Sequence, residues 1–386
     1  MAAKEEKSSV PSPDGDDGRI EVIELWRLPS DFYELPLEAQ FKAVEVATVP
    51  GERLSGPRSP CPMAWGEQAY FVLWSLVTLG LPLALVPVSL GLALFRPGLL
   101  AYWFGGLGVL ALHPIQTFIR ESRRRRIGLI MARYFTMTVI LDRKDPIMKL
   151  FGKPGIDKED LRADLPVIPL ACPHGVLNFG AILWALFSRW IAGIEQYTAG
   201  APPMMYVPGL RYLIQSLWFV HADRKSMKRH LQERPTPTKP RGGVVGIVPD
   251  GIAGIFHSSP GRDVLHLGGK RGLMRIAIEE GALLAAGWFS GTTDCFTVVQ
   301  DPFGVMKWIS RKLRLSIFLF YGRWGLPVPR RAPTSMCPVF VRAPKVESPS
   351  EEQVEKLHQD VYGGLVQQFD RLKHYTGYGD RTLTVT

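Results

Sequence analysis

Hydrophobic and polar residues alternate in blocks along the last two thirds of the chain, and these blocks predict an α/β fold. Short apolar runs typical of buried strands recur at residues 165–171, 243–249, 283–289 and 316–321. Segments typical of helices lie among them, at residues 179–194, 210–220, 270–280 and 351–373. Because strands that alternate with helices usually form a parallel sheet, we expect a mostly parallel sheet with covering helices over residues 120–386.

Two long stretches without Asp, Glu, Lys or Arg precede this region, from Ala69 to Phe95 and from Leu99 to Ile119. Since about 20 apolar residues span a bilayer, we expect a membrane-anchoring helical hairpin, transmembrane or re-entrant, over residues 67–119. A buried hairpin in a soluble core is the alternative. Arginines flank both ends, at positions 53 and 58 and at 120 and 123–126, which predicts that both ends and residues 120–386 are cytosolic.

The remaining N-terminal region, residues 1–66, is expected to be cytosolic and disordered at its start. Residues 1–19 are polar and mixed in charge, without the apolar core of a secretory signal. Residues 20–26 and 32–46 contain amphipathic patches that could lie on a membrane.

Charge and cysteine usage narrow the class of partner. The chain has 386 residues and a formal net charge of +10, which suits an acidic membrane surface or a phosphorylated substrate. No nucleic-acid-binding module is present, so we expect no nucleic acid. The four cysteines are scattered, which indicates idle thiols in a reducing compartment, and we expect no metal site.

The tetrapeptide Cys172-Pro173-His174-Gly175 follows the first predicted strand and offers the clearest candidate chemistry. A proline and a glycine restrict and shape the turn that carries the histidine. An unperturbed histidine titrates near pH 6.5 and suits general base catalysis. A structural or merely solvated histidine is the alternative interpretation.

With the hairpin and several further blocks in the same order, the chain resembles the diacylglycerol acyltransferase type-2 family, which also holds monoacylglycerol and wax-alcohol acyltransferases. The family motif His-Pro-His-Gly corresponds to residues 172–175. The block Pro-Gly-Gly-x-x-Glu corresponds to residues 249–254, and Arg-x-Gly-Phe-x-x-x-Ala resembles residues 270–277. The aromatic-Gly-Glu segment is similar to residues 289–294.

The chain departs from these motifs at three positions. Cys172 stands in place of the first motif histidine, Asp250 in place of the first motif glycine, and Gly254 in place of the motif glutamate. The Pro249-Asp250-Gly251 sequence also resembles the Pro-Glu-Gly block of glycerol-phosphate and lysophospholipid acyltransferases. Those enzymes carry His-x4-Asp, whereas Phe179 occupies the aspartate position here. The resemblance implies a glycerolipid-acyltransferase-like fold.

Acyl transfer from a thioester to an alcohol needs a base and donors for the developing oxyanion. We expect His174 to be the base, as the family resemblance also implies. Asp250 would orient the imidazole or bind the acceptor, although a turn-forming aspartate is the alternative. The N–H groups of Gly175 and Val176 would serve the oxyanion if they open the following helix. A Cys172 thiolate nucleophile is a second mechanism, against which we favour a packing role.

Further residues are candidates for substrate binding. Lys270 and Arg271 would contact phosphates at the start of a helix, and Asp294 is either a site residue or a solvated loop acid. Two basic clusters, at 221–241 and 307–314, would hold the phosphates of coenzyme A or the membrane, or simply be solvated. The full candidate set for substrate binding is Pro173, Gly175, Asn178, Pro249, Gly251, Lys270, Arg271 and Asp294.

The resemblance implies an acyl-CoA-dependent O-acyltransferase in the endoplasmic reticulum membrane, with lipid droplets as a second location. Diacylglycerol is the leading acceptor, and acyl-CoA acts as co-substrate without another cofactor. The alternatives are a monoacylglycerol, wax-alcohol or lysophospholipid acyltransferase, or a catalytically degenerate lipid-binding member. A homo-oligomer is left open.

Overall fold

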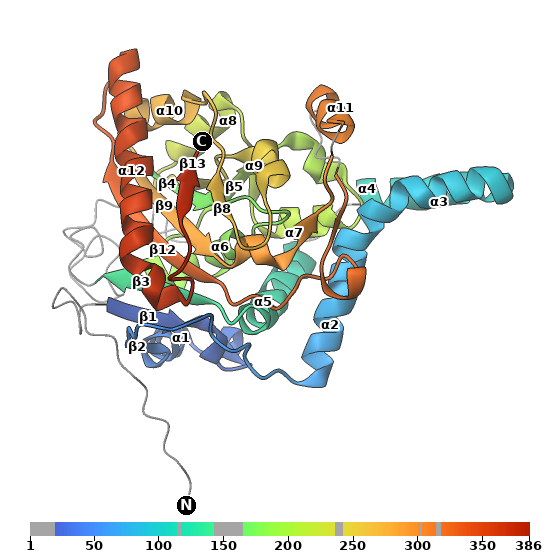
Figure 1. The fold of residues 1–386 in the computed structure, drawn as a ribbon, viewed down its shortest axis with the longest axis horizontal. Coiled ribbons are helices and arrows are strands. Elements are labelled where there is room, and N and C mark those ends of the chain that lie inside the picture. The colour runs from blue at the N-terminus through green and yellow to red at the C-terminus, as the bar shows by residue number, and fades with distance from the viewer. Residues whose placement is uncertain (1–19, 114–116, 143–164, 236–241, 302, 314–317) are drawn as a thin grey trace, which may run out of the picture.

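The protein is built around one large twisted sheet with helices on both faces (Figure 1). A computed structural model of the chain describes residues 20–113, 117–142, 165–235, 242–301, 303–313 and 318–386. Nine strands within these residues form the sheet, in the order β2-β1-β3-β12-β9-β4-β7-β5-β6. The predicted disorder of residues 1–19 and most of the predicted loop at 234–241 lie outside the described residues.

Most neighbouring strands in the sheet are parallel, which confirms the predicted sheet type. Strands β9, β4, β7, β5 and β6 are parallel to one another, whereas β12 is antiparallel to β9, and β1 is antiparallel to β2 and β3. The strands are β1 (Ile20–Glu24), β2 (Thr48–Pro50), β3 (Thr138–Asp142), β4 (Val167–Cys172), β5 (Tyr197–Gly200), β6 (Phe219–His221), β7 (Val245–Ile247), β9 (Leu283–Ser290) and β12 (Ser335–Arg342).

Helices cover the sheet, and two short strand pairs lie outside it. The pairs are β8 (Asp263–Leu265) with β13 (Leu383–Val385), and β10 (Thr297–Val298) with β11 (Phe320–Tyr321). The helices are α1 (Leu37–Val46), α2 (Trp65–Ser75), α3 (Leu81–Phe95), α4 (Leu100–Leu112), α5 (Thr117–Tyr134), α6 (Phe179–Ala192), α7 (Leu210–Ser216), α8 (Arg224–Leu231), α9 (Gly251–His257), α10 (Gly272–Glu280), α11 (Val305–Leu313) and α12 (Glu351–Thr376).

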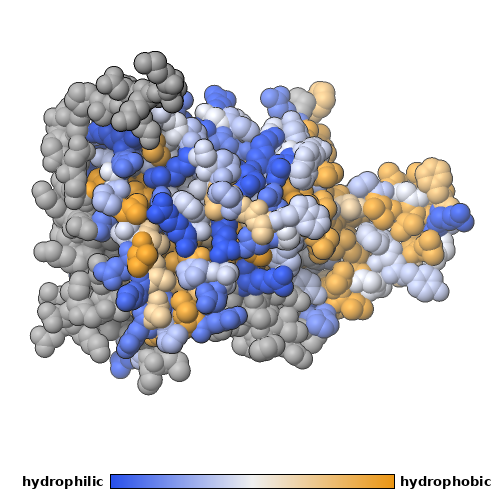
Figure 2. All heavy atoms as spheres, turned by 90° about the horizontal axis from the view of Figure 1, so that it is seen from below, coloured by the Kyte–Doolittle hydropathy of each residue, from blue (hydrophilic) through white to orange (hydrophobic). Residues whose placement is uncertain are grey.

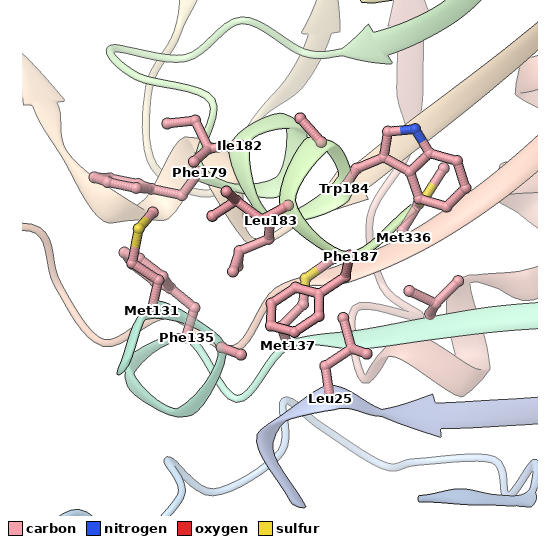
Figure 3. Close-up of a cluster of buried hydrophobic side chains, with 14 of the residues drawn as sticks. Leu25, Met131, Phe135, Met137, Phe179, Ile182, Leu183, Trp184, Phe187 and Met336 are labelled. Carbon is pink, nitrogen blue, oxygen red and sulfur yellow. The ribbon is translucent and has the colours of Figure 1, made fainter. Parts of the chain in front are cut away.

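The central strands bury side chains on both faces, because successive residues of a strand point to opposite sides. In β9, Leu283 and Phe289 belong to the core that α5 and α6 cover, whereas Leu284 and Trp288 face the core that α8, α10 and α12 cover. Figure 3 shows the first of these cores, with α6 side chains packed against Met131 of α5 and against Phe135, which follows that helix. The sheet therefore separates two cores, and its ends carry the loops on which a site can form.

Two of the predicted elements are wrong. The run at 316–321 is not a strand of the large sheet, because its described part contributes only β11 to the small pair with β10. The helix predicted at 210–220 ends at Ser216, and Trp218 has a φ of 53°, which turns the chain into β6. Pairing of β6 with β5 fixes this second half as a strand. The other predicted strands and helices are present within a few residues of their expected limits.

The amphipathic patches of the N-terminal region are part of the folded body, and their contact with a membrane stays a prediction. β1 and β2 extend the sheet beside β3, and α1 packs against α6, where Gln40 Oε1 accepts a hydrogen bond of 2.7 Å from Trp190 Nε1. The predicted boundary at residue 66 stays a prediction, although β1 and β2 belong to the same sheet as the residues that follow.

The predicted hairpin is present but is divided differently from expectation. Among the described residues, one helix, Trp65–Leu85, is long and apolar enough to be a candidate membrane span. Its first half packs on the body, where Phe71 contacts the rings of Tyr134 and Phe135. α3 and α4 project from the body as an apolar arm (Figures 1 and 2). The predicted second span is wrong as a single helix, because α4 ends at Leu112 and residues 117–119 begin α5.

Candidate active site

The candidate histidine lies on a turn between β4 and α6, at the carboxyl end of a central parallel strand. Ligands of α/β sheets usually bind at this end. β4 ends at Cys172 and α6 begins at Phe179, after the N-cap residue Asn178. The Asn178 side chain accepts a bond of 2.7 Å from Ala181 N and donates one of 2.5 Å to the Pro173 carbonyl. Asn178 is buried and holds the turn against the helix, and its predicted role in substrate binding stays untested.

A hydrogen bond to the backbone fixes which nitrogen of the His174 ring carries the proton. Its Nδ1 lies 2.9 Å from the Gly175 carbonyl oxygen. A carbonyl oxygen only accepts hydrogen bonds, so Nδ1 carries the proton and Nε2 of the neutral ring keeps its lone pair. The side chain is half-buried, which leaves it accessible to a substrate. This arrangement suits His174 for accepting a proton at Nε2.

Asp250 is joined to the histidine turn through the backbone rather than through the imidazole. The Asp250 carboxylate is 0% exposed, and its Oδ2 accepts a hydrogen bond of 3.0 Å from the backbone N–H of His174. Burial raises the pKa of Asp250, and the adjacent His174 opposes this shift. Within the described part of the chain, Asp250 Oδ1 is buried without a hydrogen-bond partner. The carboxylate therefore positions the turn and keeps one oxygen unsatisfied beside it.

Gly254 provides the space in which the Asp250 side chain lies. Residues four apart on a helix lie on the same face, and Asp250 directly precedes α9, in which Gly254 lies. A Cβ atom at position 254 would be 2.0 Å from Asp250 Oδ2 and 2.4 Å from Asp250 Cγ. The two departures from the second motif block are therefore complementary, since the carboxylate at 250 occupies the volume next to the glycine at 254.

Three further predicted residues lie beside Asp250. Pro249 and Gly251 flank it in the chain, and Gly251 has a φ of +55° at the start of α9. The exposed Lys270 donates a hydrogen bond of 3.0 Å from Nζ to the Asp250 carbonyl. The structure thus brings together His174, Asp250 and Lys270, which are far apart in the sequence.

Other predicted residues are engaged elsewhere. Arg271 pairs with Glu355 at 2.7 Å and contacts His358 of α12, rather than facing His174. Asp294 accepts bonds from Gly261 N at 2.8 Å and from Arg381 at 2.7 Å, and so ties the C-terminal segment to the loop before β8. The expectation that Gly175 and Val176 open the helix is wrong, because α6 begins three residues later, at Phe179.

The Cys172 side chain points away from the turn into the core that α12 covers. It is completely buried, and burial raises the pKa of its thiol well above the usual value. A protonated thiol is a poor nucleophile. All four cysteines of the chain are buried and unpaired.

The structure places two further residues beside the turn, Thr292 and Ser258, which are not among the predicted site residues. Gly175 has a φ of +59°, and a Cβ atom there would lie 3.3 Å from Thr292 Cγ2 and 4.0 Å from Ser258 Oγ. Thr292 lies in the segment that resembles a family block, so that block could have indicated it. Ser258 follows α9 and has no motif of its own, and only the fold places it beside the turn.

Comparisons with known proteins extend this description. The family model for diacylglycerol acyltransferase matches residues 155–386. Mouse acyl-CoA wax alcohol acyltransferase 2 is 29% identical over 240 residues, covering 58% of this chain and 70% of that protein. Bovine diacylglycerol O-acyltransferase 2-like protein 6 is 26% identical over 227 residues, covering 54% and 65%. Human diacylglycerol O-acyltransferase 2 is 26% identical over 225 residues, covering 54% and 56%.

No solved structure matches the chain. The family match begins before β4, includes the His174 turn and the Asp250 block, and continues to the C-terminus. It covers more than half of the chain. The chain therefore belongs to the diacylglycerol acyltransferase family and is an enzyme of the acyltransferase type.

Proposed function

We propose that the enzyme transfers a fatty acyl group from acyl-CoA to diacylglycerol, giving triacylglycerol, with His174 as the general base. The observation that carries the proposal is the His174 geometry, in which Nδ1 donates to the Gly175 carbonyl and Nε2 is the nitrogen left to accept a proton. The names of human diacylglycerol O-acyltransferase 2 and its relatives support an acyl-transfer reaction with a neutral lipid acceptor.

The reaction follows from this geometry in two steps. Nε2 of His174 takes the proton of the acceptor hydroxyl while the hydroxyl oxygen attacks the thioester carbonyl carbon. The tetrahedral intermediate then collapses, the C–S bond breaks, and the leaving thiolate receives the proton from the imidazolium. No cofactor takes part, because the thioester already supplies the activated acyl group.

Asp250 acts in this scheme as a positioning residue. Its bond to the backbone N–H of His174 fixes the turn, and its negative charge lies close to the imidazolium that forms. A buried carboxylate next to a developing positive charge lowers the energy of the charged state. The same bond makes the turn sensitive to changes at position 254.

A second acceptor class is supported by one observation. Mouse acyl-CoA wax alcohol acyltransferase 2 is slightly more similar to the chain than human diacylglycerol O-acyltransferase 2, at 29% against 26% identity. A long-chain alcohol offers the same hydroxyl to His174 and needs no glycerol-binding residues. The acceptor assay described below also tests monoacylglycerol and lysophospholipid as acceptors, and it tests the alternative of a catalytically degenerate lipid-binding protein.

We further propose that the protein is anchored in the endoplasmic reticulum membrane through the α3–α4 arm, with the catalytic body in the cytosol. Helix α3 contains 15 residues and is about 22 Å long at 1.5 Å per residue. The hydrocarbon core of a bilayer is about 30 Å thick. Trp103 Nε1 of α4 donates a bond of 3.0 Å to Ser89 Oγ of α3, which joins the two sides of the arm. Because α3 is shorter than the hydrocarbon core is thick, the arm favours a re-entrant hairpin over two complete spans.

Exposed aromatic residues in and just before α11 support the same orientation. Phe303 is 90% exposed, and Trp308 of α11 is 61% exposed with Lys312 Nζ 5.0 Å from its ring centre. Figure 1 shows α11 on the side of the body that carries α3 and α4. Aromatic and basic residues of this kind prefer the interface between headgroups and water. We propose that α11 rests on the membrane while the arm enters it.

Expression in cells that lack triacylglycerol synthesis tests the function. The expected result is restored triacylglycerol with the wild-type protein and none with His174→Ala, at equal protein levels in the membrane fraction. Membranes supplied with labelled acyl-CoA and, separately, diacylglycerol, monoacylglycerol, a long-chain alcohol or a lysophospholipid identify the acceptor. Absence of every ester product with the protein present in membranes would contradict transferase activity and support the lipid-binding alternative.

A further inference from the structure

A cavity lies at the carboxyl ends of β6 and β7, on the sheet face that α8, α10 and α12 cover. Its volume is about 430 Å³. It is lined by residues of α8 and α10, by the chain after β7 and by Tyr362 of α12. A second hollow, near Leu165 and Arg342, lies at the opposite edge of the sheet, where β4 begins and β12 ends. The first cavity is therefore the one that lies at the same edge as His174.

The lining of this cavity is mainly apolar. Met227 of α8 and Met274 of α10 line it together with Leu267 and Ile276, and all four are buried in the protein. Methionine side chains are flexible and polarisable, so they adapt to a long apolar ligand. Pockets of this volume with apolar walls and a few polar groups are typical of small-molecule sites.

The mouth of the cavity lies close to the candidate base. Pro249 and Lys270 both line the cavity. Lys270 Nζ bonds to the carbonyl of Asp250, and the carboxylate of Asp250 bonds to His174 N, each at 3.0 Å. Two residues, Lys270 and Asp250, thus connect the cavity wall to the histidine turn through hydrogen bonds.

The cavity also lies apart from the proposed membrane side of the protein, from which the lipid acceptor would enter. Figure 1 shows α8, α10 and α12 on the side of the body away from α3. An acceptor dissolved in the bilayer would reach His174 from the side of the arm. A ligand in the cavity would reach the same residue from the aqueous side, which suits a water-soluble donor.

We propose that this cavity binds the acyl chain of the acyl-CoA donor and limits its length. The proposal rests on the proposed function for the identity of the ligand. The chain would lie between α8 and α10, and its thioester would lie at the mouth beside Lys270. The coenzyme A part would extend into solvent. The depth of the apolar slot then sets which fatty acyl groups the enzyme uses.

Photolabelling tests the location independently of turnover. The full-length protein in phospholipid nanodiscs is incubated with palmitoyl-CoA that carries a diazirine near the end of the acyl chain. After irradiation, the labelled peptides are identified by mass spectrometry. We expect label on residues of α8 and α10, reduced by excess unlabelled palmitoyl-CoA. Label confined to α3, α4 or the far edge of the sheet would overturn the proposal.

A substitution inside the cavity tests chain-length control. Leu273 lines the cavity and is only partly buried, so Leu273→Trp fills it without crowding the closed core. We expect this variant to lower kcat/KM for an 18-carbon donor about tenfold or more relative to an 8-carbon donor. Val366→Trp is the matched control, because Val366 is also partly buried against the same core but does not line the cavity. We expect no change of chain preference in the control.

The outcomes separate this proposal from the proposed function. An active wild-type enzyme whose chain preference is unchanged by Leu273→Trp would overturn the cavity assignment and leave the reaction intact. A wild-type protein without transferase activity would contradict the proposed function, and the photolabelling result would still decide whether the cavity holds an acyl chain.

Discussion

Replacing Gly254 by alanine is expected to disable the site without touching the histidine. The new Cβ atom would lie 2.0 Å from Asp250 Oδ2, far inside normal contact distance. Asp250 is completely buried and α9 holds position 254, so the carboxylate has to leave its place. The hydrogen bond of 3.0 Å to His174 N would be lost with it.

The magnitude follows from the two effects separately. Overpacking a closed core by a methyl group costs about 1–3 kcal/mol. A buried N–H group left without its acceptor costs about another 1–3 kcal/mol. If about 1.4 kcal/mol of this total appears in the transition state, the rate falls about tenfold. We therefore expect kcat to fall about tenfold or more and the unfolding temperature to decrease.

The assay is acyl transfer in membranes that contain equal amounts of each variant, together with thermal unfolding of the purified protein. Gly363→Ala is the matched control, because Gly363 lies on the exposed side of α12 and a Cβ atom there meets nothing within 4 Å. Alanine replaces glycine in a helix in both variants, and the control gains about 1 kcal/mol of helix propensity.

The double variant Asp250→Ala/Gly254→Ala separates crowding from loss of the carboxylate. Without the Asp250 side chain the new methyl group has room, so the part of the stability that Gly254→Ala loses to crowding is expected to return, whereas His174 N still lacks its acceptor and activity stays low. Full activity of Gly254→Ala, equal to that of Gly363→Ala, would refute the reasoning, because it would mean that the carboxylate can move without consequence.

Three further predictions concern the base, pH dependence and membrane contact. His174→Ala is expected to abolish transfer, whereas Cys172→Ala keeps most activity, and the reverse result in the same assay would favour the thiolate mechanism. Burial raises the pKa of Asp263 to about 6, above the unfolded value of about 3.9. Because the folded state keeps this proton to higher pH than the unfolded state does, the free energy of unfolding falls as pH rises from about 4 to about 6. We expect the unfolding temperature of Asp263→Asn to change less with pH in this window than that of the wild-type protein. Trp308→Asp is expected to lower the fraction of protein that sediments with anionic vesicles. Val46→Asp changes an exposed residue of α1, away from the arm, and is expected to leave that fraction unchanged. An equal decrease in both variants would contradict an oriented membrane surface.

The mainly parallel sheet and most of its helices could be predicted from the sequence, because burial on both faces leaves continuous apolar runs such as 283–289 in β9. Strands whose sequences are short or mixed were missed. β6 follows α7 without a break in the apolar pattern, and only its pairing with β5 makes it a strand. Likewise, the local sequence of β1 indicates only an amphipathic patch, and its pairing with β3 shows that it is a strand.

The candidate site shows the same division. His174 and the four-residue spacing of Asp250 and Gly254 can be read from the sequence, and the resemblance to the family assigns them to one site. Their complementarity could be recognised only in the tertiary structure, since it depends on how the start of α9 places both residues against the histidine turn. The engagement of Arg271 with α12 and of Asp294 with Arg381 also depends on partners far away in the chain.

The sequence by itself thus determined the alternation of strands and helices, the apolar hairpin and the histidine turn, because these depend on local composition and short spacings. Only the tertiary structure decided that α2 packs on the body, that the projecting arm is short, and that Cys172 faces a core. It also decided that Asp250 contacts the histidine turn, whereas Asp294 pairs with Arg381. Long-range packing sets these features, because burial and hydrogen-bond partners come from segments that no local pattern connects.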